Sequence, residues 1–178
     1  MENDIAKILL DESQLQKIVD DIAESINFDY NGQDIVVIGI LKGSVIFLAD
    51  LFRKIKLKCY LDFMAASSYG SSAISSGKVK IIKDLSADIT GKHVIIVEDI
   101  LDTGNTLSYI KEYLEQKNPL SVKICTLFDK PSRRMKPIKP DYLGMTIPDL
   151  FIVGYGLDYD EKYRNLPYIG VLKNEVYS

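Results

Sequence analysis

The sequence has few of the residues that form metal centres and disulfide frameworks. It contains two cysteines, Cys59 and Cys125, and a single histidine, His93. Each cysteine lies in an apolar, strand-like run, so two buried reduced thiols are expected rather than a disulfide or a zinc site. His93 has no serine, cysteine or acidic partner at a recognisable spacing, and we predict no catalytic role for it.

Long apolar segments and a surplus of basic residues are also missing. No apolar run approaches the roughly 20 residues of a membrane span, and no basic start followed by a long apolar stretch opens the chain. We therefore expect a cytoplasmic protein with no membrane partner. The formal net charge of -3 argues against a general nucleic-acid binder, which needs a basic face.

Two nucleotide-binding motifs are absent as well, since neither GxxxxGK[ST] nor GxGxxG occurs. Their absence excludes a nucleoside-triphosphate P-loop and a dinucleotide fingerprint. The composition is that of an ordinary folded protein, because 47% of residues are hydrophobic and 26% are charged. A length of 178 residues then predicts a single domain, 1–178.

Apolar periodicity predicts helices that alternate with strands. One helix begins after Asp11, whose pairing with Gln14 resembles a capping box, and its apolar residues extend to Ile26. Further helices are expected over 45–55 and 106–116, and strands over 35–41, 58–66, 78–85, 93–100, 122–128 and 151–157. The alternation predicts an α/β fold with an open, mainly parallel twisted sheet flanked by helices. The Ser- and Gly-rich segment 67–77 is expected to be a mobile loop.

The strongest functional signal follows the strand that begins at His93. This strand runs directly into Glu98 and Asp99, and ligands of such sheets bind beyond the carboxyl ends of the strands. Carboxylates at that position can hold vicinal hydroxyls or a hydrated cation. The small and hydroxyl side chains of 102–106 leave backbone N–H groups free to bind an anion at the start of the next helix, which predicts a phosphate site.

The stretch VIIVEDILDTGNTL, 94–107, is similar to the diphosphoribose-binding motif of type I phosphoribosyltransferases. Further matches at 41–43, 129–131 and 153–167 extend the resemblance over nearly the whole chain, and Asp102 resembles the hypoxanthine-guanine branch of that family. The resemblance implies the type I phosphoribosyltransferase fold with a small base-binding hood from the terminal segments. It also implies a single phosphoribosyltransferase domain.

The resemblance assigns roles to the junction. Glu98 and Asp99 would contact the ribose hydroxyls and a magnesium ion, and Asp102 would act as general base toward purine N7. The 5′-phosphate would be held by Asp102, Thr103, Gly104, Asn105 and Thr106. Asn105 occupies a position that is frequently basic in relatives, so only its backbone N–H is expected to contribute.

The resemblance also implies roles outside the junction. Asp158 would contact the metal, and Arg164 would bind diphosphate together with the loop of Lys42 and Gly43, where a cis peptide bond between Leu41 and Lys42 is expected. In the base pocket, Lys130 would donate to the 6-oxygen, Phe151 would stack on the purine and Ile152 would contact it through its backbone. Ser68 and Tyr69 would lie in a loop that closes during the reaction.

The function implied is transfer of 5-phosphoribosyl from 5-phosphoribosyl 1-diphosphate to N9 of hypoxanthine or guanine, by a magnesium-dependent homodimer or homotetramer. Two alternatives stay open: a regulator that senses phosphoribosyl diphosphate and controls transcription, and an enzyme of the same fold for adenine, orotate or another pyrimidine. The preference among hypoxanthine, guanine and xanthine also stays open. Apart from Lys130, the cations Arg133, Arg134, Lys136 and Lys139 are expected to form a solvated or subunit-contact surface.

Overall fold

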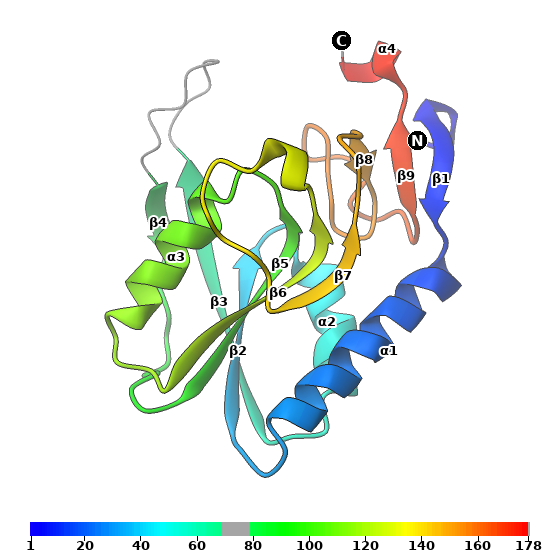
Figure 1. Ribbon diagram of the computed structural model, residues 1–178. Helices are drawn as coiled ribbons and strands as arrows, with labels where there is room; N and C mark the ends of the chain where they lie inside the picture. The colour runs from blue at the N-terminus through cyan, green and yellow to red at the C-terminus, as the bar shows by residue number, and fades with distance from the viewer. Residues whose placement is uncertain (69–78, 178) are drawn as a thin grey trace.

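A six-stranded sheet forms the centre of the computed structural model, which describes residues 1–68 and 79–177. The strand order is β4-β3-β2-β5-β6-β7 (Figure 1). The bounds are β2 (Ile35–Leu41), β3 (Cys59–Ser68), β4 (Val79–Lys83), β5 (His93–Leu101), β6 (Ser121–Asp129) and β7 (Tyr142–Thr146). All neighbours pair in parallel except β3 and β4, so the predicted mainly parallel sheet is confirmed.

Helices cover both faces of this sheet (Figure 1). α1 (Glu12–Asp29) and α2 (Val45–Lys54) pack on one face, and α3 (Asn105–Glu115) packs on the other. α1 begins at the predicted capping box, in which Asp11 Oδ1 accepts from the Gln14 amide at 2.9 Å and the Gln14 side chain accepts from the Asp11 amide. These bonds satisfy two polar groups at the site where the helix starts.

The continuous apolar run of β2 reflects burial on both faces. Val37 packs in the core formed with α1 and α2, whereas its neighbours Val36 and Ile38 pack in the core formed with α3. Because successive side chains of a strand point to opposite faces, a strand covered on both sides needs apolar residues at every position. The sequence pattern of this strand therefore predicted its central place in the sheet.

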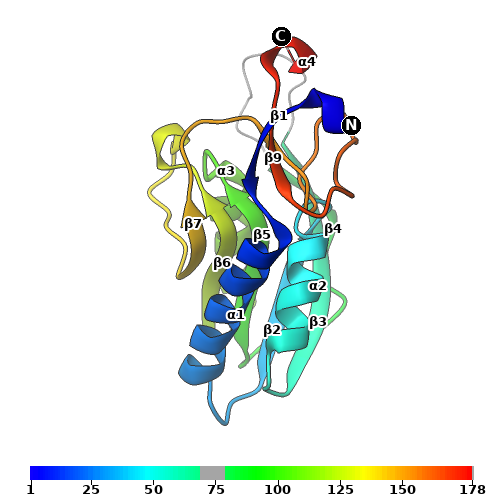
Figure 2. The ribbon, with the colours of Figure 1, turned by 90° about the vertical axis from the view of Figure 1, so that its right-hand side faces the viewer.

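A second, smaller sheet forms a hood above the carboxyl ends of the large one (Figure 2). It consists of β1 (Ile5–Leu10), β9 (Ile169–Leu172) and β8 (Ile152–Val153), in that order and antiparallel. η1 (Glu2–Asp4) and α4 (Asn174–Tyr177) flank it. The hood therefore comes from both ends of the chain, as the family resemblance implied.

Parts of the sequence fold differently from expectation. The strand predicted over 151–157 is confined to β8, because Gly154 and Gly156 take positive φ angles of 100° and 105° and turn the chain. β7 was not predicted, since it lies among the prolines of 131–148, next to η2 (Pro131–Arg133). In the described part of the chain, no helix is long and apolar enough to cross a membrane.

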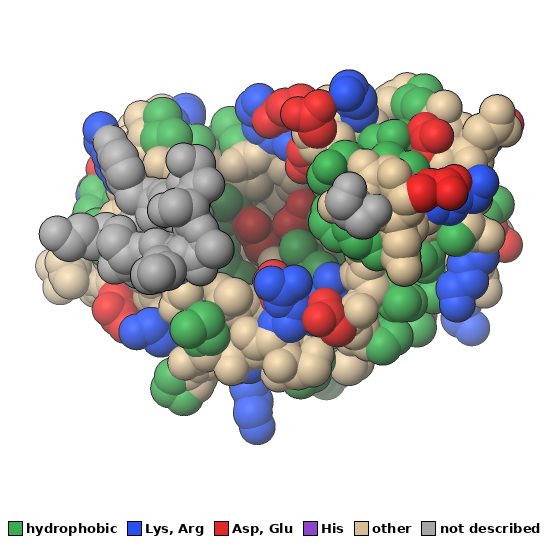
Figure 3. All heavy atoms as spheres, turned by 90° about the horizontal axis from the view of Figure 1, so that it is seen from above, with side chains coloured by type: hydrophobic (Ala, Val, Ile, Leu, Met, Phe, Trp, Pro, Cys, Tyr) green, Lys and Arg blue, Asp and Glu red, His purple; other side chains and the backbone are tan. Residues whose placement is uncertain are grey.

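The strand order reverses between β2 and β5, because β3 lies on the far side of β2 and β6 lies on the far side of β5. The connections that follow such neighbouring strands diverge to opposite faces and leave a crevice at their carboxyl ends. Seen from above, this end of the molecule is hollowed, and acidic side chains lie on the floor of the hollow (Figure 3). The sheet topology therefore leaves a crevice at the end of β5, the strand end that the sequence analysis singled out.

Candidate active site

Two adjacent carboxyl groups lie at the end of β5. One oxygen of Glu98, Oε2, is buried and has no hydrogen-bond partner among the described residues. Burial, reinforced by the charge of Asp99, raises the pKa of Glu98 well above its usual range. A buried acid pair of this kind gains from a cation or from hydroxyl donors, which are the groups that a bound, metal-carrying sugar would supply.

Asp99 is 8% exposed, and its Oδ1 accepts from the Ile100 amide at 2.7 Å. Burial raises its pKa to about 6, and the charge of Asp158 acts in the same direction, whereas the Ile100 amide and the charge of Arg164 oppose the rise. The carboxyl group of Asp99 is therefore poised to lose its proton close to neutral pH. A positively charged ligand would favour that loss.

The loop after β2 lies directly against this acid pair. The peptide bond between Leu41 and Lys42 is cis, as predicted. A Cβ atom at Gly43 would lie 1.7 Å from Asp99 Oδ2, so only glycine lets the loop backbone approach the carboxylate this closely. The predicted residues of the two strand ends are therefore brought together at the switch point of the sheet.

Arg164 and Asp158 lie close enough to Asp99 for their charges to affect its carboxyl group. Arg164 pairs with Asp158 Oδ1 at 2.8 Å and donates to the Gly156 carbonyl at 2.8 Å. Glu161, to which the sequence analysis gave no role, pairs with Arg164 at 3.3 Å and with Lys42 Nζ at 3.0 Å. Glu161 thus pairs with both cations expected to bind diphosphate. The sequence pattern did not indicate this role, because Glu161 lies in a dense run of charged residues, 158–164.

The expected metal-contacting acids do not form a ready-made cluster. In the ranges 1–68 and 79–177, no group of three or more His, Cys, Asp or Glu side chains is placed to hold an ion. Asp158 is occupied by Arg164 and by the Glu161 amide, which donates to it at 2.9 Å. Glu98 and Asp99 therefore fit magnesium best, as the one or two carboxylates that such an ion takes when substrate phosphates supply its other ligands.

The loop 102–106 connects β5 to α3. Gly104 occupies the N-cap position with a φ of 84°, a left-handed conformation that favours glycine. The Thr103 hydroxyl accepts weakly from the Asn105 amide, at 3.4 Å. The loop thus leads into the positive end of an 11-residue helix, which is the geometry expected of a phosphate site.

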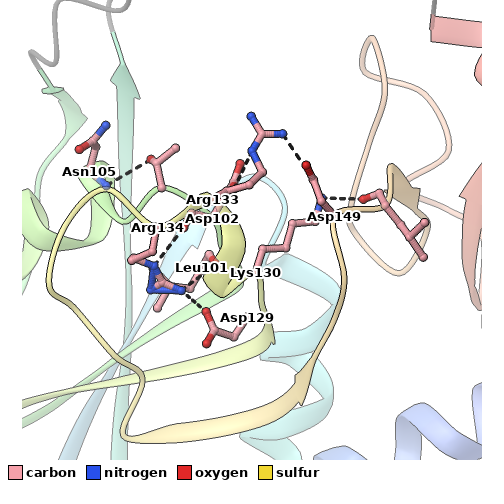
Figure 4. Close-up of polar contacts among 10 residues, drawn as sticks. Leu101, Asp102, Asn105, Asp129, Lys130, Arg133, Arg134 and Asp149 are labelled. Atoms are coloured by element: carbon pink, nitrogen blue, oxygen red, sulfur yellow. Dashed lines mark hydrogen bonds and ion pairs between the residues drawn. The ribbon is translucent and has the colours of Figure 1, made fainter.

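A chain of ion pairs links Asp102 to Lys130 (Figure 4). Arg133 Nε lies 3.2 Å from Asp102 Oδ1, and Arg133 Nη1 lies 3.7 Å from Asp149 Oδ1. Asp149 Oδ1 is also 3.6 Å from Lys130 Nζ, and this ammonium donates to the Leu150 carbonyl at 2.6 Å. Lys130, although 7% exposed, is therefore held beside the segment that precedes Phe151.

Arg134 contradicts the expectation of a solvated basic surface. Its side chain is 15% exposed and pairs with the carboxylate of Asp129, which is 13% exposed. Its remaining donors reach the carbonyls of Leu101, Asp102 and Ile138. A guanidinium so enclosed belongs to the framework of the site, and a basic run in a sequence cannot distinguish it from an exposed neighbour.

The remaining predicted residues lie in or near the hood. Phe151 is 36% exposed, and its ring stacks on Tyr177 with centroids 4.6 Å apart. Ile152 is buried in β8. Ser68 ends β3, paired with Val79 of β4, and Tyr69 lies outside the described residues, as does nearly all of the loop expected to close.

Comparison with known proteins places these features in context. Residues 6–160 match the phosphoribosyl transferase domain. The chain is 50% identical over 177 residues to the hypoxanthine-guanine phosphoribosyltransferase of Bacillus subtilis strain 168, covering 99% of this chain and 98% of that one. A crystal structure of a hypoxanthine phosphoribosyltransferase from Staphylococcus aureus superimposes with a TM-score of 0.97 at 50% identity, over 100% of this chain and 97% of that one.

A third relative is much longer. The chain is 48% identical over 178 residues to the bifunctional protein TilS/HprT of Listeria innocua, and it spans 28% of that protein's length. The similarity thus covers nearly all of this chain in both cases, and in the longer relative the matching region is one part of a larger protein.

Proposed function

This chain belongs to the phosphoribosyl transferase family, and from that membership we propose that it transfers the 5-phosphoribosyl group of 5-phosphoribosyl 1-diphosphate to N9 of hypoxanthine or guanine. The observation that carries the proposal is the junction after β5. There the acid pair Glu98 and Asp99 and the loop 102–106 lie at one strand end, beside the loop of Lys42 and Gly43. One end of this junction suits vicinal hydroxyls, and the other suits a phosphate.

The transfer breaks the bond between the anomeric carbon and the diphosphate oxygen, which leaves with the bonding electrons. Purine N9 supplies the electron pair of the new bond, and the proton on N7 passes to the Asp102 carboxylate. Positive charge grows on the sugar during this exchange, so nearby carboxylates stabilise it. Glu98 and Asp99, at the end of β5, are the carboxylates we assign to this task.

Magnesium would be held by Glu98 and Asp99 together with the substrate, and it would neutralise charge on the departing diphosphate. Arg164 and Lys42 would bind the same group. Both cations pair with Glu161, at 3.3 and 3.0 Å, so diphosphate would replace one carboxylate partner with another anion. Asp158, which pairs with Arg164, would orient this arginine or join the metal's ligands.

The purine base would bind between the ion-pair chain and the hood. Lys130 would donate to the 6-oxygen of the purine. Its ammonium donates to the Leu150 carbonyl at 2.6 Å, which holds it next to Phe151, the residue proposed to stack on the base. The backbone of Ile152 would contact the base, and Ser68 and Tyr69 would help to exclude water. A lysine donor at this place favours hypoxanthine and guanine, which carry an acceptor oxygen at position 6, over adenine, which carries an amino group there.

The decisive experiment incubates the protein with phosphoribosyl diphosphate, magnesium and one nucleobase at a time, and follows mononucleotide formation by chromatography. We expect IMP and GMP, and no comparable product from adenine, orotate or uracil. A preparation that binds phosphoribosyl diphosphate without turnover would favour the regulator instead. Sedimentation of the same sample tests the predicted homodimer or homotetramer, and fractionation of cells tests the predicted cytoplasmic location.

A further inference from the structure

Where β5 leads into the loop 102–106, the three consecutive carbonyl groups of 101–103 bond to one short segment behind the loop. Arg134 Nε donates to the Asp102 carbonyl at 3.1 Å, and Arg134 Nη2 donates to the Leu101 carbonyl at 3.3 Å. The Met135 amide donates to the Thr103 carbonyl at 2.8 Å. The segment that follows η2 therefore grips the loop backbone on one side.

The direction of these carbonyls fixes the direction of the amides. In a planar trans peptide the carbonyl of one residue and the N–H of the next point in opposite directions. Because the carbonyls of 101–103 face Arg134 and Met135, the N–H groups of 102–104 face away from that segment. In the described part of the chain, the Thr103 and Gly104 amides make no hydrogen bond, so they remain free to bind an anion.

The back of the loop is closely packed. A Cβ atom at Gly104 would lie 2.7 Å from Ile138 Cγ2 and 3.2 Å from Arg134 Cδ. Glycine at this position therefore lets the loop backbone lie directly against the segment behind it.

Arg134 itself is firmly anchored (Figure 4). Its guanidinium pairs with the Asp129 carboxylate at the end of β6, and Nη1 donates to the Ile138 carbonyl at 2.9 Å. A planar fork with five donors can serve these acceptors simultaneously, whereas a lysine ammonium is a point charge on a flexible stem. Its positive charge also lies at the carbonyl ends of the loop peptides, which favours the peptide dipoles whose N–H ends point outward.

We propose that Arg134 is a positioning residue that orients the amides of the loop 102–106 toward the 5′-phosphate of the nucleotide. The proposal rests on the proposed function, in which this loop binds that phosphate. Arg134 does not touch the substrate, since it acts from behind through the Leu101 and Asp102 carbonyls. Its removal should weaken phosphate binding and leave contacts to the base and the ribose intact.

The test measures the dissociation constants of guanosine and of GMP. The ratio of the guanosine value to the GMP value isolates the contribution of the phosphate. In Arg134→Met we expect this ratio to fall at least about tenfold, the order of one charge-assisted hydrogen bond. Arg134→Lys keeps the charge but not the fork, so it should lose most of the same ratio. Lys139→Met is the matched control: Lys139 is an exposed cation of the same proline-rich segment, and the ratio should not change.

A further variant, at Asp129, keeps the test valid if Arg134→Met does not fold. Asp129→Asn keeps Arg134 in place but removes its anchoring charge, so the ratio should fall less than in Arg134→Met. Circular dichroism establishes which variants fold, and the ratio is compared among those. An unchanged ratio in a folded Arg134→Lys or Asp129→Asn protein would overturn the proposal, as would an equal fall in Lys139→Met. A wild-type ratio near one, by contrast, would contradict phosphate binding by the loop and with it the proposed function.

Discussion

Arg133 Nε lies 3.2 Å from Asp102 Oδ1, so the proposed general base has a positive partner within the protein. The same arginine reaches Asp149, which in turn approaches Lys130. One ion-pair chain thus joins the group proposed to accept a proton from purine N7 with the group proposed to recognise the 6-oxygen. A purine that presents N7 to Asp102 must compete with Arg133 for that carboxylate.

Replacement of Asp102 by asparagine should slow turnover at least ~100-fold, because an amide cannot accept the N7 proton. The dissociation constant of phosphoribosyl diphosphate should change little, since the loop amides remain. Steady-state kcat and an equilibrium titration measure the two quantities separately. Undiminished turnover would exclude proton transfer to Asp102.

The neighbours Arg133 and Arg134 should differ in their contribution to stability. The side chain of Arg133 is 50% exposed, so Arg133→Met should change the free energy of unfolding by no more than ~1 kcal/mol. Arg134→Met leaves Asp129 nearly buried without its cation, which typically costs ~3 kcal/mol. Urea titration of both variants checks this contrast, and equal losses would show that burial does not separate the two arginines.

Replacement of Gly43 by alanine should weaken binding of phosphoribosyl diphosphate, because the new Cβ would lie 1.7 Å from Asp99 Oδ2 and must displace that side chain. We expect KM for this substrate to rise about tenfold or more, the loss of one charged contact. Gly32→Ala is the control: its φ of 77° is strained for alanine, but a Cβ there meets nothing within 4 Å. KM should be normal in that variant, although its stability falls; a normal KM in Gly43→Ala would refute the steric argument.

Asp62 should make the protein sensitive to acid. Burial by itself would raise the pKa of this carboxyl, but hydrogen bonds from the backbone amides of Ala87, Phe63 and Ser86, with the charge of Lys83, lower it below its usual value. A lowered pKa stabilises the fold above the unfolded-state value of about 3.9, and this contribution is lost as pH falls through the folded-state pKa.

Asp62→Ala leaves the Ser86 and Ala87 amides without their acceptor, so we expect a loss of ~2–4 kcal/mol at pH 7. The difference from wild type should shrink as the pH falls toward 3. Thermal melts from pH 7 to 3 measure it, with Glu24→Gln on the exposed side of α1 as a control. A difference that stays constant with pH would mean that the carboxylate charge is not involved.

The framework was predictable where one local pattern determines the structure. The β-branched run of β2 and the capping box at Asp11 each specify an element by themselves, and the predicted bounds agree closely. β7 was missed because its place depends on pairing with β6, and the surrounding prolines obscure the pattern. The hood strands β1 and β9 were missed for a similar reason, since each is short and pairs with the opposite end of the chain.

The site was predictable to the extent that it is contiguous in sequence. Glu98, Asp99 and the loop 102–106 follow one strand, and the sheet topology brings Gly43 to them. Arg134 and Glu161 were missed because each lies in a run of like or mixed charges, where the burial that distinguishes one cation or one acid is a tertiary property. One signal was available for Arg134. Asp129 ends a buried strand five residues before it, which could have indicated the ion pair between them.

The hood joins segments that lie far apart in the sequence, since Ile5 of β1 pairs with Leu172 of β9. A loop that spans most of the chain has a large closure entropy, and local contacts form ahead of such pairings. While residues before 169 are still being translated, β1 has no strand beside it. The sheet and the loop 102–106 can therefore assemble before the hood, which is completed only after β9 has been made.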